Sequence, residues 1–212
     1  MSNIKNETVG WKKLASKEEI QKTIESLKKN GFFAELAEDG EDAKKKVLDI
    51  IPEGSEVMNM TSVTLETLGI AEEIAKSGKY NDVRKKFERM MADKKQKREM
   101  KKIGAAPEYA IGSVHAITQN GEILIASGTG SQLPAYAYGS DKVIFVVGTQ
   151  KIVKNLDEGI RRIYEHSLPL ESERAKKAYG VPGSSVNKIL IINKEVSPSR
   201  IHILFVNRVL GF

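Results

Sequence analysis

The sequence contains no cysteine, and this absence excludes several kinds of chemistry. Disulfide bonds, thiolate nucleophiles and cysteine-ligated zinc or iron–sulfur clusters all need thiol groups. A cysteine-free chain fits the reducing cytoplasm. We therefore expect a cytoplasmic protein without a cysteine-ligated metal. We also expect no other metal and no cofactor.

Long hydrophobic runs are missing as well. No apolar stretch approaches the roughly 18 residues needed to span a bilayer, and the polar segment 1–7 lacks the apolar core of a secretory signal. We therefore expect no membrane association. The chain has 212 residues, of which 40% are hydrophobic and 29% charged, as in ordinary globular proteins. This length suits one α/β domain over 16–212, preceded by an N-terminal extension over 1–15.

Positive charge is concentrated in one segment of the chain. Residues 81–102 include ten Lys or Arg and four Asp or Glu, so their excess equals the net charge of +6 of the whole chain. Val83, Phe87, Met90 and Met91 form a thin apolar seam, which predicts a charged helix on the surface. Stacking aromatic residues are nearly absent there, which disfavours nucleic acid as a partner. The alternative is a helix that docks an acidic partner protein.

The hydrophobic pattern alternates between helical and extended segments. Ser16 and Glu19 form a capping box at the start of the first helix, and Asn120-Gly121 is a hairpin turn. The alternation predicts an α/β, Rossmann-like fold with a mostly parallel sheet flanked by helices. A C-terminal strand pair, 188–193 and 201–207, is expected to be joined through Pro198. The other predicted helices lie near 41–51, 65–78 and 152–163, and the other strands near 32–36, 56–60, 123–126 and 142–148.

Two loops have the composition of a ligand site. Gly128 and Gly130 follow the apolar strand 123–126, and backbone N–H groups at glycines can approach a ligand closely. The hydroxyl-rich loop 59–64 joins a strand to a helix, which is the usual ligand position in open α/β sheets. Each loop has an ordinary alternative, because glycine pairs form common turns and Ser or Thr often only caps a helix.

Familiar catalytic and nucleotide-binding motifs are absent from the sequence. His115, His166 and His202 have no metal-ligand spacing, and there is no GxSxG elbow. The GxG pair lacks the third glycine of the dinucleotide motif and the lysine of a P-loop. The sequence therefore identifies no catalytic group, and we expect each histidine to be structural.

Five blocks of the sequence, taken in order, resemble the lactate utilization (LUD) domain family. They are 58–70 (MNMTSVTLETLGI), 112–121 (GSVHAITQNG), 128–130 (GTG), 146–158 (VVGTQKIVKNLDE) and 210–212 (LGF). The resemblance runs from about Ser16 onward and is most specific in 146–158. It implies the fold shared by glucosamine-6-phosphate deaminases, ribose-5-phosphate isomerases and CoA transferases. Some family members belong to an iron–sulfur protein system that oxidises lactate to pyruvate, so the resemblance also implies other lactate-utilization subunits as partners.

Two departures from the family limit what the resemblance implies. Many relatives carry a cysteine cluster where this chain has 178–185, so a metal cluster is excluded here. Relatives often have glutamate before the hairpin turn, whereas this chain has Gln119. An amide serves neither as a carboxylate nucleophile nor as a general base. Glu122 does not obviously replace it, because residues three apart on a strand face opposite sides.

We expect the protein to bind a small anionic metabolite, a carboxylate or a phosphate, in lactate or related organic-acid utilization. Lys151 would add a point charge, although a lysine at the start of a helix is also often a surface residue. The alternative is a non-enzymatic subunit that docks a partner through its basic helix. The sequence leaves open whether the protein is an enzyme and whether it forms a homo-oligomer. The expected ligand-binding residues are Asn59, Thr61, Ser62, Thr64, Gln119, Asn120, Gly128, Thr129, Gly130, Ser131, Gln132 and Lys151.

Overall fold

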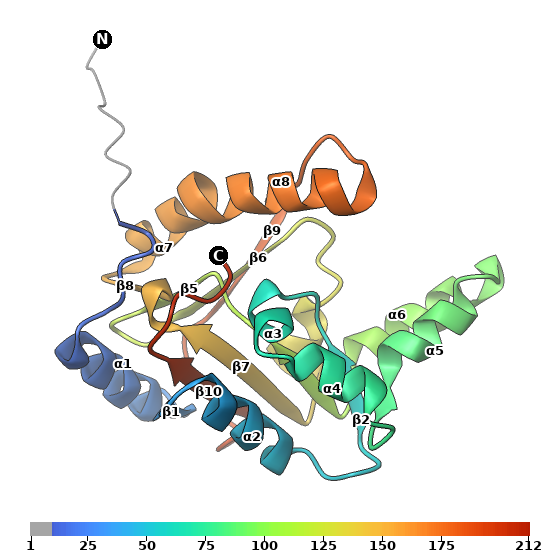
Figure 1. The fold of residues 1–212 in the computed structure, drawn as a ribbon, viewed down its shortest axis with the longest axis horizontal. Helices are drawn as coiled ribbons and strands as arrows, with labels where there is room; N and C mark the ends of the chain where they lie inside the picture. Colours follow the sequence, from blue (N-terminus) through green and yellow to red (C-terminus); the bar gives the residue numbers. More distant parts are fainter. Residues whose placement is uncertain (1–9) are drawn as a thin grey trace.

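The computed structural model describes residues 10–212 and has an α/β fold with a parallel sheet at its centre (Figure 1). Each strand of this sheet runs parallel to its neighbours. The predicted α/β fold with a mostly parallel, helix-flanked sheet is confirmed. Of the predicted N-terminal extension, residues 1–9 lie outside the described part, and Trp11 and Ala15 pack against the domain. In spatial order the strands are β1 (Phe33–Ala37), β10 (Ile201–Val206), β7 (Lys142–Gly148), β4 (Tyr109–Gly112), β2 (Glu56–Asn59) and β3 (Asn81–Asp82).

A second sheet packs against one face of the central sheet. Its strands lie in the order β8 (Ile152–Val153), β5 (Ala116–Thr118), β6 (Ile123–Ser127) and β9 (Lys188–Ile192). The strands β5 and β6 are antiparallel and flank the predicted hairpin turn. Gly121 in this turn has a φ of +87°, a backbone conformation that glycine adopts without steric cost.

Helices complete a layered structure. Phe145 and Val147 of β7 face α1 and the second sheet, whereas Ile144 and Val146 face α2, α3 and α4. This strand is buried on both faces, as its continuous apolar run predicted. The outer face of the second sheet packs against α7 and its neighbours. The helices are α1 (Lys17–Lys29), α2 (Gly40–Ile50), α3 (Val63–Thr67), α4 (Ile70–Lys76), α7 (Leu156–Arg162) and α8 (Leu168–Tyr179).

Local signals set several helix boundaries. The Ser16 hydroxyl accepts the Glu19 N–H at 3.2 Å, and the Glu19 carboxylate accepts the Ser16 N–H at 2.8 Å, so the predicted capping box is present. The helix predicted over 65–78 is instead two helices. Gly69 lies between α3 and α4 with a φ of +66°, and this left-handed residue interrupts helical continuity.

The two strands predicted at the end of the chain belong to different sheets. Both strands form, but β9 pairs with β6, and β10 lies between β1 and β7 in the central sheet. The side chains of β10 explain this position, because Ile203 and Leu204 point to opposite faces and both are fully buried. A strand with two apolar faces suits the centre of a parallel sheet better than an exposed hairpin.

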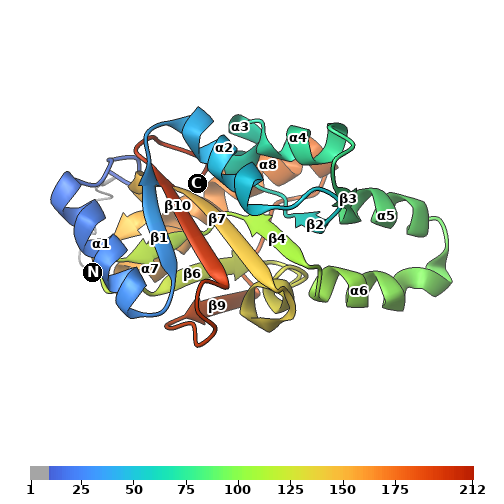
Figure 2. The same ribbon diagram turned by 90° about the horizontal axis from the view of Figure 1, so that it is seen from below.

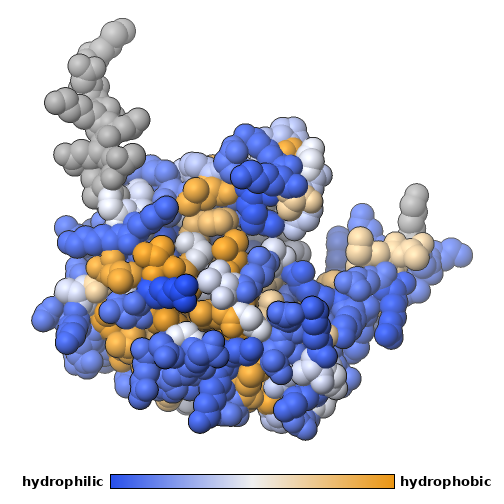
Figure 3. All heavy atoms as spheres, viewed as in Figure 1, coloured by the Kyte–Doolittle hydropathy of each residue, from blue (hydrophilic) through white to orange (hydrophobic). Residues whose placement is uncertain are grey.

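The basic segment forms a helical hairpin that projects from the body (Figures 1 and 2). It consists of α5 (Val83–Met90), η1 (Lys94–Gln96) and α6 (Lys97–Ala105), so the single charged helix predicted here is two helices. The ring of Phe87 packs against Gly104, where the missing side chain lets the two helices approach closely. Figure 3 shows that this projection is mostly hydrophilic. Within residues 10–212, no helix is both long and apolar enough to cross a membrane.

Candidate functional site

A cavity of about 440 Å³ opens at the carboxyl ends of three adjacent strands, β2, β4 and β7. The loop after β2 contributes hydroxyl groups, β4 is followed by Ser113, and η3 (Thr149–Lys151) follows β7. The end of β6 and helix α8 form the opposite wall. The chain continues outward from β2 to β3 and then returns to β4, so the strand order reverses at this point. Such switch points are the usual ligand positions in open α/β sheets.

Lys151 is the most unusual residue of the cavity. Its side chain is only 1% exposed, and Nζ donates hydrogen bonds to Ser113 Oγ at 3.1 Å and Thr64 Oγ1 at 3.4 Å. Both hydroxyl hydrogens are already used, because Ser113 donates to the Val146 carbonyl and Thr64 donates to the Leu210 carbonyl. A neutral amine has two N–H groups, which these two acceptors satisfy. An ammonium group has a third N–H, for which residues 10–212 offer no acceptor.

The electrostatic surroundings of Lys151 agree with its hydrogen bonds. Burial, followed by the nearby charge of Arg162, holds the pKa of Lys151 well below its usual range. Arg162 is itself fully buried, and burial lowers its pKa to about 10. Its Nη1 donates to the His115 carbonyl and to Ser167 Oγ, whereas Nε and Nη2 have no partner among the described residues. A positive potential therefore surrounds an amine that favours its neutral form.

His115 lines the same cavity in a defined tautomer. The Ala126 N–H donates to His115 Nδ1 at 3.1 Å, so the ring hydrogen resides on Nε2 in the neutral form. Burial, then the charges of Lys151 and Arg162, lowers the pKa of His115 to about 3. The ring is therefore neutral at physiological pH and offers a hydrogen-bond donor at Nε2.

Two arginines mark the rim of the cavity. Arg84 reaches in from α5 and donates to the Asn59 carbonyl and the Thr61 hydroxyl. Arg174 on α8 is paired with Glu171 at 2.7 Å, so its charge is compensated. Among the ion pairs of residues 10–212, none includes Arg84, which lines the cavity, or Arg162, which contacts the lining residues His115 and Ser167 from behind. Uncompensated positive charge thus lies at the cavity and next to it.

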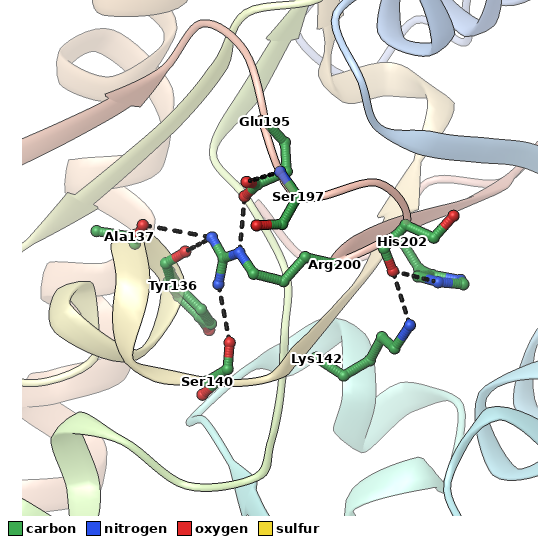
Figure 4. A network of polar contacts seen from close by, with 9 residues as sticks. Tyr136, Ala137, Ser140, Lys142, Glu195, Ser197, Arg200 and His202 are labelled. Atoms are coloured by element: carbon green, nitrogen blue, oxygen red, sulfur yellow. Dashed lines mark hydrogen bonds and ion pairs between the residues drawn. The ribbon is translucent and has the colours of Figure 1, made fainter.

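A buried ion pair fixes the segment that carries Tyr136, another cavity residue (Figure 4). Arg200 Nε contacts Glu195 at 2.7 Å, and the two side chains are only 11% and 8% exposed. The same guanidinium donates to the carbonyls of Ser140, Tyr136 and Ala137. These acceptors belong to the π-helical turn η2 (Ala135–Gly139) and the residue after it. The β9–β10 connection therefore holds one wall of the cavity in place.

A family model identifies the relatives of this chain. The model of the LUD domain matches residues 20–206, which is most of the sequence. The chain belongs to the LUD domain family. A search of curated proteins found no match.

Solved structures show the fold of this LUD domain in another protein. A DUF162 family protein from Deinococcus radiodurans matches with a TM-score of 0.55 at 10% sequence identity, over 90% of this chain and 97% of that chain. At this identity the likeness shows the fold alone. Two weaker matches follow. The structure of eIF2B beta from Chaetomium thermophilum has a TM-score of 0.30 at 11% identity, over 66% of this chain and 44% of that chain. Ribose 5-phosphate isomerase from Plasmodium falciparum has a TM-score of 0.33 at 16% identity, over 76% of this chain and 79% of that chain.

Most of the ligand-binding residues predicted for the LUD domain lie together. Lys151 is buried and lines the cavity, so the alternative interpretation of Lys151 as a surface residue is wrong. Asn59 is buried at the end of β2, next to these residues, and its Oδ1 has no partner among the described residues. The predicted residues that line the cavity are Thr61, Ser62, Thr64, Gly128, Thr129, Ser131, Gln132 and Lys151.

The prediction that Gln119 and Asn120 belong to the same ligand site as the glycine loop is wrong. Gln119 accepts from Lys22 and donates to Glu19, both on α1, and the Asn120 carbonyl accepts from Asn30. The hairpin turn and the glycine loop lie at opposite ends of β6, so the length of that strand separates them. The absence of a carboxylate at position 119 therefore says nothing about chemistry in the cavity.

The glycine loop differs from its prediction in a second way. Gly130 does not line the cavity, and its N–H donates to Ser127 Oγ at 2.8 Å. The Ser131 N–H donates to Thr129 Oγ1 at 3.3 Å. These two backbone donors stabilise the loop itself, so the side chains of the loop, more than its backbone, face the cavity.

Sequence reasoning missed several residues of the LUD domain site. Ser113 and His115 lie within the family block 112–121, which was a usable signal for both. Arg84 was assigned to the surface charge of the basic segment, although it lines the cavity. Arg162 gave no signal, because a basic residue in an amphipathic helix is normally exposed. The segment 178–185 brings Ser184 and Ser185 to the cavity wall.

Proposed function

We propose that this LUD domain binds a small anionic metabolite, a carboxylate or a phosphate, in the cavity at the ends of β2, β4 and β7. The observation that carries the proposal is the positive charge of Arg84 on the cavity rim and of Arg162 behind the lining residues His115 and Ser167, neither of which forms an ion pair among residues 10–212. Arginine stays charged at neutral pH. A buried guanidinium without a counterion is unfavourable, and an anion in the cavity would reduce that cost.

The neutral groups of the cavity support the same proposal. Hydroxyl groups of Thr61, Ser62 and Ser131 lie on its walls, and each can donate to an oxyanion, whereas Thr129 donates to Ser131 Oγ at 3.1 Å. The volume of about 440 Å³ lies in the range of small-molecule sites. Membership of the LUD domain family supports a role in lactate or related organic-acid utilization, with other proteins of that process as partners.

Thermal unfolding in the presence of ligands tests this proposal. Lactate, pyruvate, ribose 5-phosphate and acetyl-CoA form the panel, because a ligand that binds only the native state raises the melting temperature. We expect at least one small anion to raise it in a concentration-dependent way. If none of the four does, the proposal is wrong.

A matched pair of variants on α5 locates the binding. Arg84 contacts the cavity, whereas Arg89 on the same helix is exposed and does not line it. We expect Arg84→Gln to reduce the ligand-induced shift and Arg89→Gln to leave it unchanged. An equal loss in both variants would mean that only the general charge of the helix matters.

The projecting hairpin favours a second candidate function, the docking of an acidic partner protein. A shallow hollow on this hairpin is lined by Lys95, Lys97, Arg98 and Lys101. Replacing these four residues by Gln should abolish a salt-sensitive, stoichiometric complex with such a partner while the ligand-induced shift persists. Loss of the ligand-induced shift in this variant would instead assign the hairpin to the anion site.

A further inference from the structure

We propose that Lys151 forms a reversible imine with the ligand, which narrows the ligand class to small anions that carry an aldehyde or ketone group. This inference rests on the proposed function, because it takes the cavity as the place where the anion binds. Its basis is the geometry of one nitrogen atom.

The hydrogen bonds of Lys151 leave one position of its nitrogen unused. Ser113 and Thr64 accept the two N–H groups of the neutral amine, and both hydroxyls are fixed as acceptors because they donate to the carbonyls of Val146 and Leu210. The remaining tetrahedral position of Nζ carries the lone pair. The described residues bring no donor to this lone pair, and Lys151 lines the cavity. An amine held in this way is a nucleophile.

The charges around Lys151 keep the amine unprotonated. No carboxylate among residues 10–212 pairs with it, and the buried guanidinium of Arg162 disfavours a second positive charge nearby. Lysines are activated for attack on carbonyl groups in this way, by loss of solvent and by a neighbouring cation. A lysine whose only role was to bind an anion would need its charge. The site of Lys151 is therefore better suited to a carbonyl group.

The reaction balances without another reactant. The Lys151 lone pair attacks the carbonyl carbon, a C–N bond forms, and the C=O bond opens to a carbinolamine. Both amine hydrogens then leave with the former carbonyl oxygen as water, and a C=N bond remains. The hydroxyls of Ser113 and Thr64 accept the two N–H groups and so orient the amine, and the two protons transfer within the adduct from nitrogen to oxygen. The neutral His115 Nε2–H is a further cavity donor suited to the oxygen as it gains charge.

Reductive trapping tests the imine directly. Pyruvate carries a carboxylate and a ketone, ribose 5-phosphate in its open form carries a phosphate and an aldehyde, and lactate has the size and charge of pyruvate without its carbonyl group. The full-length protein is incubated with each compound and sodium borohydride, and the adducts are mapped by peptide mass spectrometry. We expect one reduced adduct on Lys151 with pyruvate, with ribose 5-phosphate or with both, and none with lactate.

Matched lysine variants control the trapping. Lys151→Met should lose the adduct, whereas Lys154→Met, which changes an exposed lysine three residues away, should retain it. Because loss of the adduct in Lys151→Met does not by itself show that the lysine is neutral, the trapping rate of the wild type is also measured against pH. A neutral Lys151 should give a rate that is already level near pH 7, whereas an ordinary lysine gains reactivity up to about pH 10.

The outcomes separate this inference from the proposed function. If pyruvate, ribose 5-phosphate or lactate raises the melting temperature but no adduct appears on Lys151, anion binding stands and the imine is wrong. Adducts spread over exposed lysines, or a rate that rises continuously to pH 10, would also overturn the imine. If no compound stabilises the protein and none is trapped, both proposals fail.

Discussion

The side-chain nitrogen of Lys151 lies 3.1 Å from the Ser113 hydroxyl oxygen, whose own hydrogen is donated to the Val146 carbonyl. This contact joins the residue that follows β4 to the residue at the end of η3, behind β7. It forces the hydroxyl to accept, so the lysine must donate. The Val146 carbonyl of β7 thereby makes Lys151 Nζ the donor in this contact.

The first prediction concerns the pH dependence of this lysine. Because its folded pKa lies well below 10.5, the unfolded chain binds more protons at neutral pH, and stability should rise with pH toward 10.5 by up to about 1.4 kcal/mol per unit. Lys151→Met removes the contribution of this lysine to the pH dependence of stability. We expect the variant to be more stable than the wild type at pH 7, with an advantage that shrinks as the pH approaches 10.5. Urea unfolding of both proteins at several pH values measures this difference, with Lys154→Met as the control. Parallel curves of unfolding free energy against pH would contradict the prediction.

The second prediction concerns acid stability and His115. Its folded pKa is about 3, below the ordinary value of 6.5. As pH falls from 6.5 toward 3, the unfolded chain gains a proton that the folded chain does not, so stability falls by up to about 1.4 kcal/mol per unit. His115→Asn keeps an acceptor for the Ala126 N–H without this titration. The variant should lose less stability than the wild type between pH 6.5 and 4 in urea unfolding. An equal loss would show that other groups dominate.

The fold was largely predictable because its signals are local. The continuous apolar run of β7 predicted a strand buried on both faces, and the capping box and the hairpin turn formed where their residues predicted. Strand pairing was the exception. Strand β10 pairs with β1, which lies more than 160 residues earlier in the chain, and no local sequence pattern indicates that pairing.

The site was partly predictable for the same reason. Hydroxyl groups after β2 and Lys151 after β7 follow from the rule that ligands bind at the carboxyl ends of parallel strands. Gln119 was misplaced because the two ends of β6 look adjacent in sequence but lie a strand length apart. The burial of Arg162 could not be predicted, since it depends on the contact of α7 with the second sheet.

The third prediction tests how closely Gly112 and Tyr136 approach. A methyl group on Gly112 at the end of β4 would overlap the Tyr136 hydroxyl. We expect Gly112→Ala to lower the free energy of unfolding by about 1–3 kcal/mol, the usual cost of overpacking. Tyr136→Phe removes the overlapping atom, so the double variant should recover part of this loss. A double-mutant cycle by urea unfolding measures the coupling, and purely additive effects would mean that the two side chains do not meet.

The last prediction concerns the ion pair between Glu195 and Arg200. Both side chains are largely buried, and Arg200 also holds the carbonyls of Tyr136, Ala137 and Ser140. Glu195→Ala leaves the buried guanidinium without its counterion, which costs about 3–5 kcal/mol where the remaining charge stays buried. The matched change at an exposed pair, Glu72→Ala opposite Lys76, should leave stability almost unchanged, because solvent screens that pair.

The same ion pair also tests the link between β10 and the cavity. Arg200 fixes the π-helical turn that carries Tyr136, and Tyr136 lines the cavity. Glu195→Ala should therefore weaken the ligand-induced rise in melting temperature as well as stability, whereas Glu72→Ala should change neither. Hydrogen exchange should show faster exchange over Ala135–Gly139 in the first variant only. If Glu195→Ala lowers stability while ligand stabilisation and exchange in that turn stay as in the wild type, the ion pair stabilises the domain without shaping its cavity.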